Sequence, residues 1–112
     1  MSQNHSIYTL SLALTAAVAA QVFVDFTGAL PVAGGNTAGA TRTSGNPGDL
    51  VPVDRLGSAV VLAGAAITSG QRVQSDANGN AIPWVAGKVA VGVALEAAAA
   101  AGQTIEIDLI PN

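Results

Sequence analysis

The chain has 112 residues, half of them hydrophobic, and it carries a net charge of -3 with only 4 Lys and Arg residues. One domain of this length buries a modest core, and Ala and Val supply most of the hydrophobic side chains, so each buries little area. The absence of a basic cluster argues against nucleic-acid binding, and the absence of cysteine excludes disulfides, thiolate metal sites and cysteine nucleophiles. We therefore expect the chain to gain stability by burying surface against other chains.

The N-terminal part combines a polar arm with a first strand. Residues 1–6 are polar and are expected to form a flexible arm. Residues 7–15 alternate with a period of two, which predicts a strand. Residues 7–20 also resemble the hydrophobic part of a signal peptide, but no Lys or Arg precedes them, so a structural strand is favoured over a cleaved leader. The stretch is too short, and too often interrupted by Ser and Thr, for a membrane span.

A second strand is predicted over residues 21–26, and five more follow a long irregular segment. That segment, residues 28–54, is rich in Gly, Pro, Thr and Asn, and it is either an extended arm that lies across a neighbouring chain or a long surface loop. Asn78-Gly79 predicts a hairpin, because both residues tolerate a positive φ. A short helical turn is expected over residues 96–101, ended by Gly102. The later strands are predicted at residues 59–62, 72–75, 81–85, 88–94 and 104–110.

A short pattern recurs in front of several predicted strands. Residues 65–73 match residues 97–105, with Gly-Gln at the same place in both, and residues 16–24 form a fainter copy. Such repetition indicates a scaffold of similar units and not a catalytic site. With many short strands and Gly-rich turns, it predicts a mainly β fold: one small β-barrel or β-sandwich domain over residues 7–112, including the loop or arm at 28–54.

No set of residues predicts an enzyme, a cofactor or a metal site. Residues 76–80 begin like a calcium-binding loop, but Ala81 and Gly87 occupy the positions that need Gly and Glu. Glu106 and Asp108 share one face of the last strand, and a solvated polar face on an edge strand accounts for them. Enzyme activity is therefore not expected.

Three segments in order resemble a bacteriophage family: residues 63–73, then Asp76-Ala77-Asn78-Gly79, then residues 92–98 with a closing alternating strand. The family is that of the small capsid cement or decoration proteins. The resemblance implies a compact β-rich virion protein, assembled in the host cytoplasm, that binds the outer surface of the head and clamps neighbouring subunits of the major capsid protein. It also implies a homo-oligomer, with a trimer favoured and a dimer possible, and no catalytic residue. Direct contact with nucleic acid or with a membrane is not expected, because the chain has no basic cluster and residues 7–20 are too short a stretch to span a membrane.

Contacts with the capsid or with a sister subunit are expected in the arm, in the 28–54 segment and at the single Trp. Two other functions stay open: an exported bacterial surface or fibre subunit with residues 7–20 as its leader, and a glycan-binding β-module that stacks sugars on Trp84 and Tyr8. Trp84 is a candidate interface contact or a core anchor, and the core role is slightly favoured. The candidate contact residues are Ser2, Gln3, Asn4, His5, Ser6, Arg42, Pro47 and Trp84.

Overall fold

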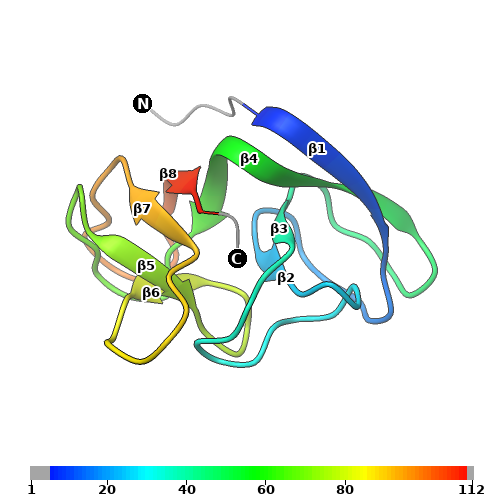
Figure 1. The fold of residues 1–112 in the computed structure, drawn as a ribbon, viewed down its shortest axis with the longest axis horizontal. Coiled ribbons are helices and arrows are strands. Elements are labelled where there is room, and N and C mark those ends of the chain that lie inside the picture. Colours follow the sequence, from blue (N-terminus) through cyan, green and yellow to red (C-terminus); the bar gives the residue numbers. More distant parts are fainter. Residues whose placement is uncertain (1–5, 111–112) are drawn as a thin grey trace.

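The computed structural model describes residues 6–110, and this range contains eight strands and no helix. The strands wrap into two small, nearly closed sheets that lie side by side and share the long strand β4 (Figure 1). This confirms the predicted mainly β, barrel-like fold. The strands are β1 (Ser6–Ala13), β2 (Phe23–Val24), β3 (Gly39–Thr41), β4 (Leu50–Leu62), β5 (Arg72–Ser75), β6 (Ala81–Pro83), β7 (Gly92–Ala94) and β8 (Thr104–Leu109).

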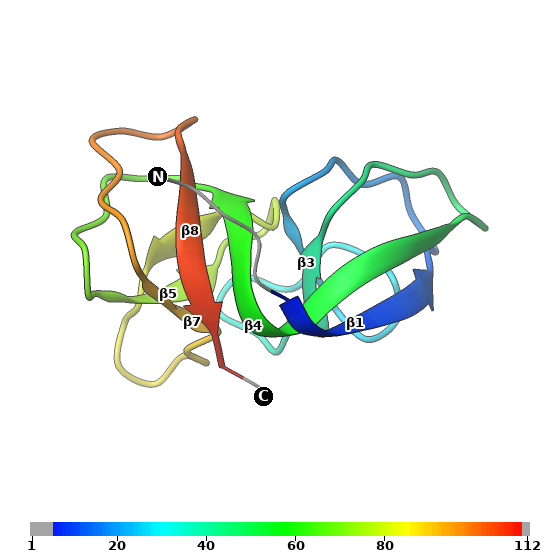
Figure 2. The same cartoon turned by 90° about the horizontal axis from the view of Figure 1, so that it is seen from above.

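Strand β4 passes from one sheet into the other. Its first part pairs with β1 on one side and β3 on the other, and β3 pairs with β2. Its second part pairs with β8, which continues through β7 and β5 to β6. The change of partner follows Gly57, whose φ of 94° suits a bend that other residues rarely adopt. Figure 2 shows β4 crossing between the two halves.

Each half has its own hydrophobic core, and the aromatic side chain of Phe23 links the two halves. Alternate residues of β4 supply both cores: Val51 and Val53 face the first, Ala59 and Val61 the second. Phe23 lies on β2 in the first half, yet it is fully buried in the core of the second half. The first core consists of Leu14, Val18, Val22, Val24, Val51 and Val53, and the second includes Val61, Ile67, Val73, Val91, Ile105 and Ile107.

The two halves repeat one arrangement. The pairs β1·β4, β3·β4 and β2·β3 of the first half correspond to β4·β8, β7·β8 and β5·β7 of the second. In both halves two loops meet through a pair of mutual backbone hydrogen bonds. These bonds are 3.0 Å long between Val18 and Gly45 and 2.9 Å long between Ile67 and Ala98. The chain is therefore one domain built from two similar units of about 50 residues, within the usual range of domain sizes.

The repeated sequence pattern forms the same turn four times, before β2, β4, β5 and β8. In each copy one residue has a positive φ: Gln21 (62°), Gly48 (91°), Gly70 (85°) and Gly102 (92°). In three copies the next side chain closes the turn by accepting a backbone N–H. The bonds run from Asn46 N to Asp49, from Thr68 N to Gln71 and from Ala99 N to Gln103, at 2.9, 3.1 and 2.8 Å. The copy before β4 is visible only in the structure, because its sequence differs too much from the other three copies.

Two segments differ from the sequence predictions. Residues 28–54 contain β3 and the start of β4, so much of this segment belongs to the sheet. Residues 96–101 form bends and an isolated bridge in place of a helical turn, because Ala98 pairs with Ile67 of the neighbouring loop.

Strand β8 was expected at the edge of a sheet, but it lies between β4 and β7 and is not an edge strand. The predicted hairpin at Asn78-Gly79 is confirmed, since β5 and β6 pair in antiparallel register around it.

Gln21 is the one residue other than Gly with a positive φ in the described chain. We expect Gln21→Gly to raise the free energy of unfolding by about 0.5–1 kcal/mol. Relief of a left-handed backbone, worth about 1–2 kcal/mol, exceeds the entropic cost of glycine, about 0.5–1 kcal/mol. Urea denaturation followed by Trp84 fluorescence measures the change. Ala20→Gly, one residue earlier at an ordinary φ, should destabilise the protein, and equal losses in both variants would contradict this account.

Candidate interaction surfaces

The candidate contact residues lie in different parts of the molecule. Ser2, Gln3, Asn4 and His5 fall outside the described residues, and Ser6 begins β1. Arg42 and Pro47 lie on the loop between β3 and β4, whereas Trp84 follows β6 in the other half. The fold therefore places Arg42 and Pro47 on one loop and Trp84 in the other half of the molecule.

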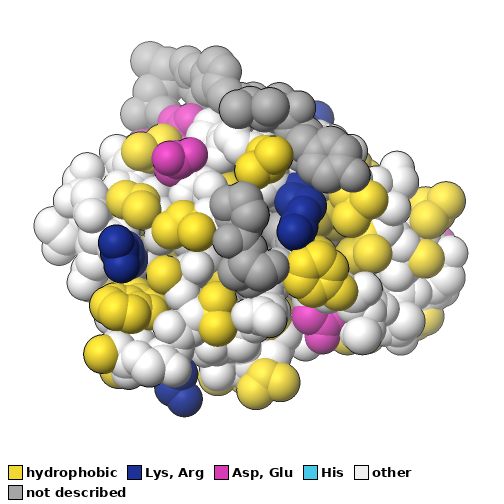
Figure 3. Space-filling view, in the orientation of Figure 1, with side chains coloured by type: hydrophobic (Ala, Val, Ile, Leu, Met, Phe, Trp, Pro, Cys, Tyr) yellow, Lys and Arg dark blue, Asp and Glu magenta, His cyan; other side chains and the backbone are white. Residues whose placement is uncertain are grey.

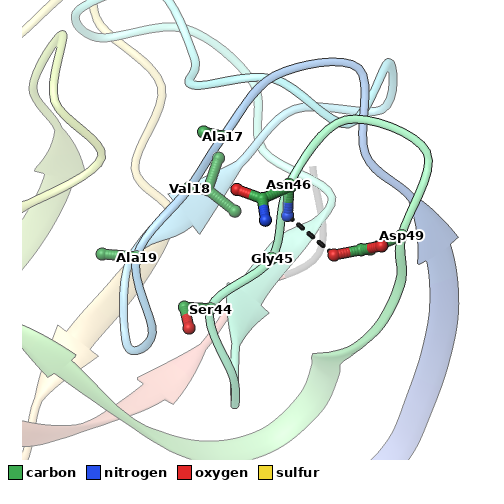
Figure 4. A pocket seen from close by; sticks show the side chains of 7 residues that line it. All are labelled: Ala17, Val18, Ala19, Ser44, Gly45, Asn46 and Asp49. Atoms are coloured by element: carbon green, nitrogen blue, oxygen red, sulfur yellow. Dashed lines mark hydrogen bonds between the residues drawn. The ribbon is translucent and has the colours of Figure 1, made fainter.

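The loop with Pro47 borders an open groove of about 430 Å³ (Figure 4). Two paired loops form its walls, one from each side of the Val18–Gly45 bridge. The Asp49 carboxylate accepts a hydrogen bond from the backbone N–H of Asn46 at 2.9 Å, so it is already used to close the turn. The groove is shallow and offers small side chains and amides without a second acid or a base. Its lining residues are Ala17, Val18, Ala19, Ser44, Gly45, Asn46 and Asp49.

Arg42 has a partner within its own chain. Its Nε donates to Oδ1 of Asp54 at 2.7 Å, and the Thr9 hydroxyl donates to the same oxygen at 3.1 Å. The Asp54 side chain is 1% exposed, whereas that of Arg42 is 39% exposed. The guanidinium therefore balances a buried carboxylate and still presents part of its surface to solvent.

Loss of the ion pair between Arg42 and Asp54 should lower the stability of the fold, and a second substitution that removes the buried charge should restore part of it. We expect Arg42→Ala to lower the free energy of unfolding by about 2–3 kcal/mol, because it leaves the buried Asp54 charge without its cation. The double variant Arg42→Ala/Asp54→Asn, which also removes the charge, should recover part of this loss. Urea denaturation measures both variants. A single variant as stable as the parent would show that the ion pair contributes nothing.

Trp84 is half-buried and lies against two basic residues. The guanidinium carbon of Arg72 is 5.8 Å from the centre of a Trp84 ring, and the indole N–H donates to the Lys88 carbonyl oxygen at 2.8 Å. A second pair of this kind, Arg55 over Phe26 at 5.0 Å, was missed in the sequence. The rarity of aromatic residues was the available signal, but nothing local in the sequence pairs Phe26 with a residue 29 positions away.

Asp25 holds the loop that carries Phe26. Burial alone would raise the pKa of its carboxyl group, but hydrogen bonds from the Thr27 hydroxyl and from the backbone N–H groups of Ala29, Thr27 and Gly28 outweigh it and lower the pKa below 3.8. The Thr27 hydroxyl and the Thr27 and Ala29 N–H groups all donate to Oδ1, at 2.6, 2.9 and 3.1 Å. Asp76 organises the matching turn of the second half, with the N–H groups of Asn78 and Asn80 both at 2.9 Å.

The lowered pKa predicts a pH effect of known sign. A carboxyl group with a depressed pKa in the folded state adds stability above its unfolded pKa, and this is lost as the pH falls through the folded value. Stability from Asp25 should therefore be present near neutral pH and decline below pH 3.8. Asp25→Asn should remove this part of the acid sensitivity in urea titrations run on both sides of that pH. An unchanged difference between the two conditions would contradict the assignment.

The described residues contain no group of three or more His, Asp or Glu side chains placed to hold a metal. Likewise, no helix in residues 6–110 is long and apolar enough to cross a membrane. The surfaces described above thus offer contacts to a partner but no assembled acid–base set.

Comparisons with known proteins agree with the sequence resemblance. A family model described as phage cement protein matches residues 1–109. Among curated proteins, none matches the sequence. Among solved structures, the head fiber gp8.5 N base of bacteriophage phi29 is similar, with a TM-score of 0.76 and 19% identity over 92% of this chain and 93% of that chain. At this identity the likeness shows a shared fold alone.

Proposed function

Because this chain belongs to the family of phage cement proteins, we propose that it binds the outer surface of the phage head and stabilises contacts between major capsid protein subunits. The family match, which spans nearly the whole chain, is the observation that carries this proposal. The protein acts as a homo-oligomer, with a trimer favoured and a dimer possible, and it is not an enzyme.

The physical character of the fold supports this role. Four repeated turns, three of them closed by a side-chain hydrogen bond, and two small cores give a scaffold with little need for charge or bulky side chains. A cement protein is present in many copies on one particle, so weak contacts add up through multivalency. Shape and surface contact are then sufficient, without a metal, a thiol or a nucleophile.

The candidate contacts are the N-terminal arm, with Ser2, Gln3, Asn4, His5 and Ser6, together with Arg42, Pro47 and Trp84. Removal of residues 1–5 tests the arm without shortening β1, which begins at Ser6. Removal of residues 28–54 would delete β3 and part of β4, so it tests folding and not binding.

Phage heads that lack this protein provide the direct test. Purified protein should sediment with such heads up to a saturating amount and should raise the temperature at which the heads release their DNA. Removal of residues 1–5 should weaken co-sedimentation. If the full chain stays in the supernatant at every ratio of protein to heads, the proposed function is wrong.

A further inference from the structure

The rings of Phe26 and Trp84 both reach the surface, and each lies beneath an arginine. Phe26 is 50% exposed under Arg55, and Trp84 is half-buried under Arg72. Arg55 is also held in place, because its Nη1 donates to the Ala38 carbonyl oxygen at 3.0 Å. A guanidinium fixed on a ring loses less freedom when a partner binds it than a free one does.

Loop 30–35 connects the two pairs across the boundary between the halves. The Gly34 N–H donates to the Ser75 carbonyl oxygen at 2.7 Å, and the Val89 N–H donates to the Gly34 oxygen at 3.1 Å. Lys88 covers Gly34 so closely that a Cβ there would lie 2.7 Å from Lys88 Cδ. Val32 on this loop is 79% exposed. Figure 3 shows hydrophobic side chains gathered on this side of the molecule with basic groups among them.

Within the part of the chain that the structure describes, the cations of this region have no carboxylate partner. Among residues 6–110 the ion pair is Arg42 with Asp54, and neither Arg55, Arg72 nor Lys88 takes part in one. Asp25, in the loop of Phe26, already uses Oδ1 to close its turn. The net charge of the chain is -3, yet three cations without a carboxylate partner among residues 6–110 lie beside exposed apolar side chains.

We propose that this surface docks an acidic patch with apolar neighbours on a protein of the phage shell. The surface, called the arginine–aromatic face, consists of Phe26, Val32, Arg55, Arg72, Trp84 and Val85. The inference rests on the proposed function and adds where the contact lies and which chemistry the partner presents. Trp and Arg dominate binding energy at protein interfaces, and opposite charge fixes the orientation of the partner.

The same features argue against other occupants. In a symmetric contact between two copies, each arginine–aromatic face would meet the identical face, so cations would face cations. Sugars stack on open aromatic faces, whereas Arg55 and Arg72 lie over Phe26 and Trp84. Nucleic acid is disfavoured by the net charge of -3.

Co-sedimentation of matched variants with protein-free heads tests the proposal. Arg55→Gln/Arg72→Gln lowers the net charge by two and should weaken binding about tenfold or more. Ala100→Glu/Ala101→Glu lowers it equally in the exposed loop before β8, and its binding should stay within about twofold of the parent. Figure 2 shows the start of β8 and the middle of β4 on opposite sides of the molecule. Thermal unfolding of both variants checks that they remain folded.

The outcomes distinguish failure of the docking site from failure of the proposed function. If the parent and both variants bind heads equally, the arginine–aromatic face is not the docking site, although the proposed function stands. If the parent does not bind heads, both fail together. A third outcome is that the Arg55→Gln/Arg72→Gln variant has a different oligomer size in sedimentation velocity, and that its loss of binding to heads follows from that difference alone. In that case the arginine–aromatic face contacts a second copy of the chain, and the proposal is overturned.

Discussion

Gly28→Ala is expected to lower the free energy of unfolding by about 3 kcal/mol or more. Gly28 has a φ of 85°, and its carbonyl oxygen accepts the Thr15 N–H at 3.1 Å where β1 meets the loop after β2. A Cβ at this position would overlap the Ala13 carbonyl oxygen and lie 2.9 Å from Leu14 Cα. Both are backbone atoms, so no side-chain rotation relieves the contact and the first sheet must open.

Gly48→Ala is the matched control for this prediction. Gly48 has a similar φ of 91°, but a Cβ there would meet nothing within 4 Å. It should therefore cost only the left-handed backbone term, about 1–2 kcal/mol. Urea denaturation of both variants gives the comparison. Equal losses would mean that the close approach of β1 to Gly28 does not contribute to stability.

Phe23→Ala should lower the free energy of unfolding by about 3–5 kcal/mol, as expected for a buried ring that leaves a cavity. Phe23 heads the fully buried side chains by volume in the described chain, and its neighbours in the second core are mostly Ala and Val. Small side chains cannot reach into the space that the ring leaves. The Phe23 N–H also donates to the Gly79 carbonyl oxygen at 2.8 Å, so the same residue ties the first half to the β5–β6 hairpin. The loss is a large part of the about 5–15 kcal/mol that stabilises a typical domain.

Phe26→Ala removes the same side chain three positions later and serves as the control. Because this ring is half-exposed, its loss should change stability by less than about 1 kcal/mol. Its effect should appear in binding to phage heads instead. Urea denaturation and co-sedimentation together separate the two roles. A large loss of stability in Phe26→Ala, or a small one in Phe23→Ala, would reverse this assignment.

Much of the fold follows from local sequence patterns. The alternation in residues 104–110 and the turn at Asn78-Gly79 depend on neighbours in the chain, so β8 and the β5–β6 hairpin lie close to where they were predicted. The repeated Gly-Gln turn is local as well. Its copy at residues 45–49 has Asp in place of Gln and contains Pro47, so composition alone suggested an irregular loop.

The features that the sequence did not reveal depend on distant residues. The length of β4 follows from pairing with β1, β3 and β8, and Gly57 within it looks like a strand end when read locally. Arg42 was expected to contact a partner, but its ion pair with Asp54 arises only when β3 lies beside β4. In the same way, the placement of Arg55 over Phe26 requires the whole first sheet.

Cryo-electron microscopy of heads incubated with this protein tests the central claim most directly. We predict added density on the outside of the shell at repeated lattice positions, into which the two-sheet fold fits with Arg55 and Trp84 toward the capsid. A bare shell after incubation with saturating protein would contradict capsid binding. Bound protein with this side turned toward solvent would leave capsid binding intact and reject the arginine–aromatic face as the site of contact.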